Sequence, residues 1–263
     1  MKILEKYGCR VDFASAPHDR SLEKPNEDRL LVDSENGIYI IIDGVTRVHA
    51  EYEAAPYESA ALKVGEIFLD NAYGYIKEHI DDDDVENTLR QAVALANGEI
   101  RKYREIKSLE DWVFYPSTLG IIAVLRGSTL HYLCVGDCMA ALIRKSSKII
   151  FGRQFSLEAV DRHNVSKKDR YDVYCNHPEN HLSYTVYNGD EVVMDGLEYS
   201  FIDIHEGDVL FLASDGIGDY IKYEKVEDLK ALTPQQMISL SGKYDAPPYA
   251  EYADDKTIIK LSF

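Results

Sequence analysis

The sequence predicts an α+β fold, a four-layer α-β-β-α sandwich with two central antiparallel sheets. Segments rich in β-branched and aromatic residues stand before and after a block of two long amphipathic helices. Strands grouped in this way pair into antiparallel sheets, and each sheet needs a helical layer on its outer face. The turns between strands are short and polar or contain glycine, which is typical of a meander. We therefore expect two packed sheets with helices outside.

The chain length is compatible with a single domain over residues 1–263. A chain of 263 residues exceeds the commonest domain size but stays within the range of sandwiches that fold as one unit. Hydrophobic residues make up 45% of the sequence and charged residues 29%, which is enough for a core without disulfides. The cysteines have neither a CxxC pair nor a zinc-type spacing.

The first half of the chain predicts two strands followed by two helices. Strands are expected at residues 29–32 and 37–43, on either side of a turn. Apolar residues spaced by three and four predict helices at 57–80 and 85–106. The acidic run 81–84 between them is interpreted as a helix cap and a negative first turn, because runs of like charge are usually solvated.

The second half of the chain returns to strands. They are expected at residues 118–125, 129–135, 140–143, 191–194, 199–204, 208–213 and 257–261, with one helix at 234–241. The segment 154–182 is polar and weakly periodic. We expect it to be irregular, to lie at the surface and to act as a flap over a site.

Charge and hydropathy exclude several classes of partner. A formal net charge of −17 disfavours nucleic acid and anionic membrane surfaces, because both would be repelled at long range. The first residues lack the apolar stretch of a signal peptide, and the sequence contains no run of about 18 apolar residues. We therefore expect a cytoplasmic protein that binds neither nucleic acid nor membrane.

Aspartates stand where predicted strands end or begin. Asp43, Asp137 and Asp215 each follow an apolar strand, and Asp254 stands just before the last one. Since one antiparallel strand begins beside the end of its neighbour, all four can meet at one edge. Carboxylates gathered at the dry end of a sheet repel one another unless a cation neutralises them. An oxygen-only ligand set without His or Cys selects Mg²⁺ or Mn²⁺ over zinc.

Six short motifs follow one another along nearly the whole chain. They read NED at residues 26–28, GIYIIIDG at 37–44, PSTLG at 116–120, VGD at 135–137, GDVLFLASDGIGD at 207–219 and DDKT at 254–257. With this order and spacing, the sequence resembles the type-2C metal-dependent serine/threonine phosphatases, the PPM family, in its compact bacterial-like form. The resemblance implies the same four-layer fold.

The resemblance also implies a metal-ligand set. Asp43 would bridge two Mn²⁺ or Mg²⁺ ions, and the Gly44 carbonyl would bind one of them. Asp215 and Asp254 would bind the other ion, which makes these three aspartates the implied catalytic residues. Asp137, together with Asp215, matches the position that holds a third metal ion in some members.

The resemblance also implies residues that orient water and bind phosphate, and the phosphate-binding position departs from the family pattern. Glu27 and Asp28 would orient metal-bound water. Many members carry an arginine four residues before the position of Glu27 to bind the substrate phosphate, but this chain has Glu23 there. Lys24 is the first substitute, as a point charge without the bidentate fork of arginine, and Arg20 is the second.

The general acid also differs from the eukaryotic pattern. Eukaryotic members often follow Asp-Gly with a histidine that acts as general acid, whereas Val45, Thr46 and Arg47 follow here. Bacterial-type members lack that histidine as well. Metal-bound water, or His49 if its loop folds back, would then protonate the leaving alkoxide. A lone histidine is more often a surface residue than a catalytic one. An arginine in a loop, such as Arg47, more often pairs with a surface carboxylate than with a phosphate.

The expected activity is hydrolysis of phosphoserine or phosphothreonine in a protein substrate. A water between two metal ions would attack phosphorus in line, without a phosphoenzyme. Two alternatives stay open. The missing arginine favours a pseudophosphatase, a signalling module that keeps the fold and binds a partner. A phosphatase of small phosphoesters is the second alternative, because substrate choice depends on surface loops.

Overall fold

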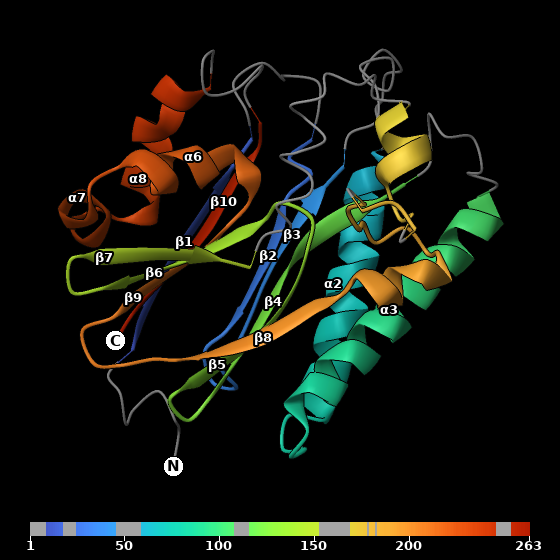
Figure 1. Cartoon of the computed structure of the whole chain (residues 1–263), viewed down its shortest axis with the longest axis horizontal. Helices are drawn as coiled ribbons and strands as arrows, with labels where there is room; N and C mark the ends of the chain where they lie inside the picture. The colour runs from blue at the N-terminus through green and yellow to red at the C-terminus, as the bar shows by residue number, and fades with distance from the viewer. Residues whose placement is uncertain are drawn as a thin grey trace.

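The computed structural model describes residues 9–17, 25–45, 59–107, 116–152, 169–177, 179–181, 183–245 and 254–263. Within these residues, the strands form two five-stranded antiparallel sheets that pack face to face. Helices cover the outer face of each sheet, so the molecule has four layers (Figure 1). This arrangement confirms the predicted α+β sandwich.

The two sheets draw on different parts of the chain. In spatial order, the first sheet consists of β1 (Arg10–Ala16), β10 (Lys256–Ser262), β9 (Val209–Ala213), β6 (Met139–Arg144) and β7 (Ser147–Phe151). The second sheet consists of β2 (Arg29–Asp33), β3 (Ile38–Gly44), β4 (Thr118–Arg126), β5 (Thr129–Val135) and β8 (Glu198–Asp203). β1 and β10 pair along their full length, so the first and last described strands are neighbours.

The helices differ in length between the two outer layers. Over the second sheet lie α2 (Ala60–Glu78) and α3 (Val85–Lys107), and over the first lie α6 (Asp215–Tyr223), α7 (Val226–Ala231) and α8 (Pro234–Ser241). Shorter helical turns are η2 (Arg170–Tyr174), η3 (Glu191–Gly196) and η4 (Gly242–Tyr244).

The main core lies between the two sheets and beneath the long helices. All residues from Ile38 to Ile42 of β3 are fully buried, because one face of the strand packs toward the first sheet and the other against α2. A strand covered on both faces needs a continuous apolar run instead of alternation. Phe68 of α2 is fully buried against this strand layer.

A second core lies between the first sheet and the short helices. Phe211 of β9 and Ile258 of β10 pack with Tyr220, Leu229 and Met237, one from each short helix. Helices of this length are marginal alone and depend on packing. The second core therefore holds α6, α7 and α8 in place.

Two lysines close the ends of the short helices. Lys148 Nζ donates to three carbonyls at the end of α6, at 2.6, 2.7 and 2.9 Å. Lys260 Nζ donates to three carbonyls at the end of α7, at 3.1, 2.7 and 2.7 Å. The last carbonyls of a helix lack partners within it, and they carry a partial negative charge that favours an ammonium group. Burial lowers the pKa of both lysines.

Several predicted elements need correction. Residues 191–194 were expected as a strand, but they belong to the 3₁₀ helix η3. The sequence patterns do not find β1, β7, α6 or α7. α6 carries Gly216 and Gly218 in its first half, which conceals the helical signal, and α7 is a helix of six residues, too short for a periodic pattern. α2 begins at Ala60, and residues 46–58 lie outside the described part of the chain.

The acidic run between the long helices is a cap, as interpreted from the sequence. Residues 81–84 are exposed, and Asp84 Oδ1 accepts a hydrogen bond from Asn87 N at 3.0 Å at the start of α3. Of the expected irregular segment 154–182, only 169–177 and 179–181 are described. They contain the turn η2 and a bridge between Cys175 and Tyr184, and are otherwise irregular.

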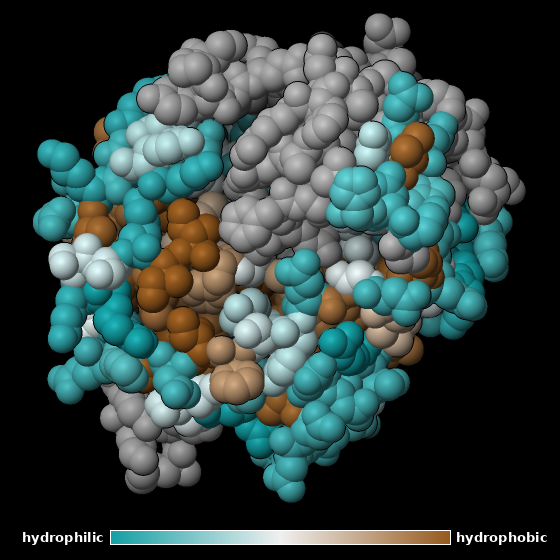
Figure 2. Space-filling model, in the orientation of Figure 1, coloured by the Kyte–Doolittle hydropathy of each residue, from teal (hydrophilic) through white to brown (hydrophobic). Residues whose placement is uncertain are grey.

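One face of the molecule carries a group of hydrophobic side chains. Figure 2 shows it over β7 and the neighbouring strands of the first sheet, within a surface that is otherwise mainly hydrophilic. Both sheets end on this side in an edge strand with an exposed apolar residue, Ile149 on β7 and Phe201 on β8. Among the described helices, none combines the length and hydrophobicity that crossing a bilayer requires.

Candidate metal centre

Three aspartates from different elements meet at one end of the sandwich. Asp43 is the next-to-last residue of β3, Asp137 lies in the turn after β5, and Asp215 opens α6 after β9. One carboxylate oxygen of each lies within 4.8 Å of those of the other two. β3 and β5 belong to the second sheet and β9 to the first, so the cluster joins the two sheets.

The fourth strand-end aspartate lies nearby but outside this cluster. Asp254 precedes β10, which pairs with β9. Its charge contributes to the raised pKa values of Asp43 and Asp215. Its Oδ1 atom accepts a hydrogen bond from Asp255 N at 2.8 Å. Asp254 therefore borders the cluster at the same end of the sheets.

Two glycines allow the chain segments to approach closely there. A Cβ atom at Gly44 would lie 2.7 Å from the Cβ atom of Glu27, and one at Gly216 would lie 2.1 Å from the Asp255 carbonyl oxygen. Any side chain at either position would force the backbone apart. The two Asp-Gly pairs of the sequence are thus required by the packing around the carboxylates.

Glu27 and Asp28 lie behind the cluster and are almost fully buried, with exposed fractions of 1% and 3%. Glu27 accepts a hydrogen bond from the Ser59 hydroxyl. Asp28 Oδ2 accepts one from Ser214 Oγ at 2.7 Å. Burial raises the pKa of Asp28 to about 7, against the lowering effect of the Ser214 hydrogen bond. Each of the two acids is thus held by a hydroxyl group.

The cluster carries more negative charge than its surroundings favour. Burial raises the pKa of Asp43 well above its usual value, and the charges of Asp28, Asp215, Asp254 and Asp137 raise it further. For Asp215, burial is again the first cause, followed by Asp137, Asp254 and Asp28. The Asp215 residue is exposed to solvent, so repulsion by the neighbouring carboxylates is the better supported of the two causes of its raised pKa.

These carboxylates fit a hard divalent cation. Two unit charges about 5 Å apart repel each other by about 3 kcal/mol at an effective dielectric constant of about 20. The hydroxyl groups of Ser59 and Ser214 donate to Glu27 and Asp28 instead of to these three carboxylates. Neutralisation by bound cations removes the repulsion. The donors are all oxygen atoms, which suits Mg²⁺ or Mn²⁺.

Other predicted residues lie outside the described part of the chain. Lys24 and Arg20, predicted to bind phosphate, are in this group, as are Arg47 and His49. Their roles stay predictions.

Three supporting residues were missed by the sequence patterns. Ser59 caps α2 by accepting from Leu62 N at 3.0 Å while it donates to Glu27, and the sequence signals only the cap. Ser214 donates to Asp28 and accepts from Thr257 N at 2.9 Å. Asp255 Oδ2 accepts from Glu27 N at 2.8 Å. In the sequence, Ser214 stands directly before Asp215 and Asp255 directly after Asp254. This proximity is the sequence feature that could have pointed to them.

The arrangement of strands and helices is that of the PPM-type serine/threonine phosphatases. No family model and no curated protein sequence matches the chain. The likeness is one of structure, and at the identities given below it establishes the fold.

Three solved structures illustrate it. The catalytic domain of the serine/threonine protein phosphatase PstP, in complex with two manganese ions, has a TM-score of 0.68 and 19% identity, covering 97% of both chains. PstP/Ppp of Mycobacterium tuberculosis has a TM-score of 0.66 and 19% identity, covering 97% of this chain and 98% of that one. PppA, a regulatory component of T6SS in Pseudomonas aeruginosa, has a TM-score of 0.64 and 18% identity, covering 97% of both chains.

Proposed function

We propose that the protein is a metal-dependent phosphatase that hydrolyses phosphoserine or phosphothreonine in protein substrates. The observation that carries this proposal is the cluster of Asp43, Asp137 and Asp215, with oxygens within 4.8 Å of one another, at one end of a phosphatase-type sandwich. Bound there, two Mn²⁺ or Mg²⁺ ions supply the positive charge that lowers the pKa of a water molecule and offsets the charge of the phosphate.

The proposed ligand roles come from the resemblance to the phosphatase family, and the positions of the residues are compatible with them. Asp43, at the end of a central strand, would contact both ions, with the Gly44 carbonyl contacting one. Asp215 and Asp254, at the facing ends of two paired strands of the first sheet, would hold the other. Asp137 would complete a third and weaker site with Asp215. These assignments place ligands from both sheets around the ions.

The chain's own residues would orient water and phosphate. Glu27 and Asp28 are fixed by Ser59 and Ser214, so their carboxylates can hold hydrogen-bonded water in one orientation. Lys24 is proposed to bind the substrate phosphate, and Arg20 is the second candidate. The net charge of −17 disfavours nucleic acid and anionic membranes as partners. We propose that the partner is a phosphoprotein of the cytoplasm.

The deciding experiment is hydrolysis of a phosphothreonine peptide with added Mn²⁺, with chelator, and by the Asp215→Asn variant. Asp70→Asn, an exposed aspartate on α2, is the matched control. We expect turnover that needs metal, is lost in Asp215→Asn and is retained in Asp70→Asn. Reagents that modify thiolates should not inhibit, because burial raises the pKa of Cys138 well above its usual value.

The alternatives give different outcomes. Metal binding by calorimetry without turnover of any phosphoester would indicate a pseudophosphatase, which the glutamate at position 23 favours. Turnover of small phosphoesters without turnover of phosphopeptides would indicate the other alternative. Chelator-resistant, thiol-sensitive turnover would contradict the metal centre itself.

A further inference from the structure

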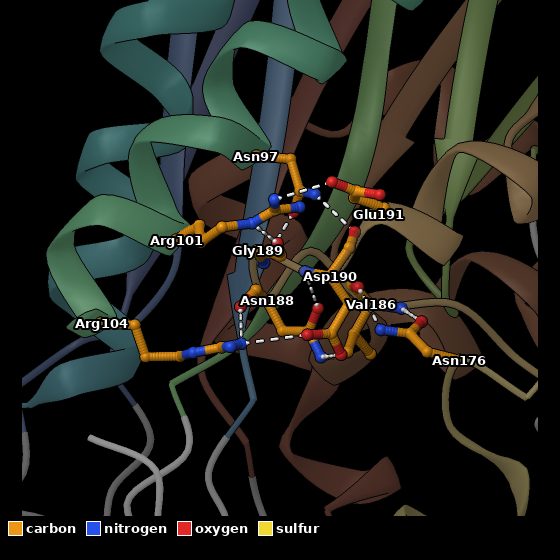
Figure 3. Close-up of polar contacts among 9 residues, drawn as sticks. All are labelled: Asn97, Arg101, Arg104, Asn176, Val186, Asn188, Gly189, Asp190 and Glu191. Atoms are coloured by element: carbon orange, nitrogen blue, oxygen red, sulfur yellow. Dashed lines mark hydrogen bonds and ion pairs between the residues drawn. The ribbon is translucent and has the colours of Figure 1, made fainter. Parts of the chain in front are cut away.

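A buried loop without regular structure, residues 184–189, precedes η3. Residues 184–189 are buried, yet they belong to no helix or strand beyond isolated bridges. Buried backbone N–H and C=O groups cost free energy unless they find partners. Three side chains on one face of α3 provide them. We call Asn97, Arg101 and Arg104 the α3 clamp (Figure 3).

Asn97 contacts the loop with both ends of its amide. Its Nδ2 atom donates to the Asp190 carbonyl at 2.8 Å, and its Oδ1 atom accepts from Gly189 N at 2.8 Å. Only 3% of the residue is exposed. A side chain that is both donor and acceptor to one backbone segment fixes its distance from the helix and its direction.

The two arginines bind the adjoining carbonyls. Arg101 Nε donates to the Gly189 carbonyl at 2.7 Å, and Arg104 Nη1 donates to the Asn188 carbonyl at 2.6 Å. Arg104 also contacts Asp190 Oδ1 at 3.2 Å. Three consecutive carbonyls therefore each receive a donor from α3, at a spacing that matches one face of the helix.

Gly189 makes this close approach possible. Its φ angle is +93°, and a Cβ atom there would lie 2.8 Å from both the N and Cα atoms of Arg101. Only glycine fits this backbone conformation and this distance. The loop is thus built to lie directly on α3.

The residue before the clamped segment carries the contact to the second sheet. Tyr187 N donates to the Thr118 carbonyl at 2.7 Å, and Thr118 N donates to the Tyr187 carbonyl at 3.0 Å. The Tyr187 ring is fully buried and stacks on Phe68 of α2, with ring centroids 4.0 Å apart. Tyr187 therefore fixes the first residue of β4 against the helical layer.

Thr118 in turn contacts the metal centre. It pairs with Gly44 in the sheet, and its Oγ1 atom donates to the Asp43 carbonyl at 2.5 Å. The adjoining Val45 N donates to the Ser117 carbonyl at 3.1 Å. The backbone that carries both predicted metal-binding groups of β3 is thus held by the start of β4.

We propose that the α3 clamp and Thr118 are positioning residues for the metal centre. The clamp fixes the buried loop on α3, the loop fixes Thr118 through Tyr187, and Thr118 fixes the Asp43 and Gly44 backbone in the geometry that binds the ions. The inference rests on the proposed function and deepens it, because it assigns a task to residues outside the proposed metal-ligand set. It also makes the buried loop 184–189 a supporting part of the centre.

Paired variants test the last contact of this chain of interactions. Thr118→Val removes the hydroxyl at nearly constant volume, whereas Thr118→Ser keeps it. We expect Thr118→Val to weaken Mn²⁺ binding in calorimetry by about tenfold and to lower kcat more than it raises KM. Thr118→Ser should keep the Mn²⁺ affinity and the kinetic constants close to those of the wild type.

A second pair tests the clamp itself. Arg104→Met should weaken Mn²⁺ binding by about threefold, and Arg104→Lys should recover part of the loss. Asn97→Leu should act like Arg104→Met. In the metal-free protein, hydrogen exchange of the peptide over residues 116–122 should be faster in Arg104→Met than in the wild type.

Two controls separate positioning from stability. Arg90→Ala removes a surface pair with Glu86 on the same helix and should change neither readout. Lys260→Met removes the carbonyl contacts of α7, so it should lower Tm without changing the Mn²⁺ affinity. If the clamp variants lower Tm and also leave the Mn²⁺ affinity and exchange at 116–122 unchanged, the clamp is only structural and the inference is wrong.

Failure of the proposed function would look different. A wild-type protein that binds no Mn²⁺ and hydrolyses no phosphopeptide would remove the metal centre. The exchange measurement on the metal-free protein would still decide whether the clamp controls the backbone at Thr118: unchanged exchange in Arg104→Met would overturn that part too.

Discussion

The two outer layers of the sandwich are held by different means. α2 and α3, with 19 and 23 residues, bury long apolar stripes against the second sheet. α6, α7 and α8, with 9, 6 and 8 residues, cover the first sheet and rely on lysine donors at two of their ends. We call these parts the long-helix half and the short-helix half. Apolar burial along two long helices is the main support of one layer, whereas the other combines a smaller apolar core with lysine contacts at its helix ends.

The metal centre lies across this division. Asp43 and Asp137 come from the long-helix half, whereas Asp215 and Asp254 come from the short-helix half. Bound cations would therefore tie together two halves that are otherwise joined by the packing of the sheets.

The largest expected effect comes from the two aspartates that the long-helix half contributes. Asp43→Asn should lower turnover by more than about 100-fold, because in the proposed assignment it removes a ligand charge from both ions. Asp137→Asn should lower it by about tenfold, because in the same assignment it affects only the proposed third and weaker site. Steady-state kinetics on a phosphothreonine peptide at saturating Mn²⁺ compare the two. Equal losses would show that Asp137 binds an essential ion.

The next effect compares the two cores directly. Phe68→Ala in the long-helix half and Met237→Ala in the short-helix half each truncate a fully buried side chain and should cost about 2–5 kcal/mol of unfolding free energy. Only Phe68 stacks on Tyr187, so only Phe68→Ala should also weaken Mn²⁺ binding. Urea unfolding and calorimetry give the two values. Equal Mn²⁺ affinities in both variants would show that the core of the long-helix half does not influence the metal centre.

The sequence predicted the long-helix half better than the short-helix half, for a physical reason. A periodic apolar pattern needs several turns to stand out, which α2 and α3 provide and α6 and α7 do not. The stabilising contacts of Lys148 and Lys260 leave no local signal. They join residues about 30 to 75 positions apart, and a lysine in a strand otherwise suggests a solvent-exposed face.

The metal centre likewise has parts that the sequence reveals and parts that it does not. The aspartates were found because each ends or precedes an apolar strand, which is a local pattern. The α3 clamp was not found, since Asn97 and Arg101 resemble ordinary polar positions of an amphipathic helix. Their partners are about 90 positions away in an irregular loop. Sequence patterns reveal groups that carry chemistry, but they do not reveal polar contacts that hold loops in place.

A pH experiment on the metal-free protein examines the boundary between the halves. The folded-state pKa of Asp28 is about 7, above its usual value of 3.8, so between these values the folded protein binds a proton that the unfolded chain does not. The resulting stability is complete below about pH 4 and is lost as the pH rises through about 7. Metal-free Tm should therefore fall by roughly 5 °C or more from pH 5 to pH 8.

Mn²⁺ should reverse this trend, because the ions compete with protons for the same carboxylates and bind more tightly as these ionise. Thermal unfolding across the pH range, with chelator and with Mn²⁺, gives the comparison. A metal-free Tm that rises between pH 5 and pH 8 would contradict the raised pKa of Asp28.

The smallest effect concerns a cap in the short-helix half. Thr233 Oγ1 accepts from Gln236 N at 3.4 Å, while the Gln236 side chain accepts from Thr233 N at 2.9 Å, which forms a capping box at the start of α8. Thr233→Ala should cost about 1 kcal/mol, and Thr233→Ser should cost less. Urea unfolding measures both. Since α8 contributes no ligand to the centre, Mn²⁺ affinity should stay at the wild-type value, and a weaker affinity would show that the short helices also set the position of Asp215.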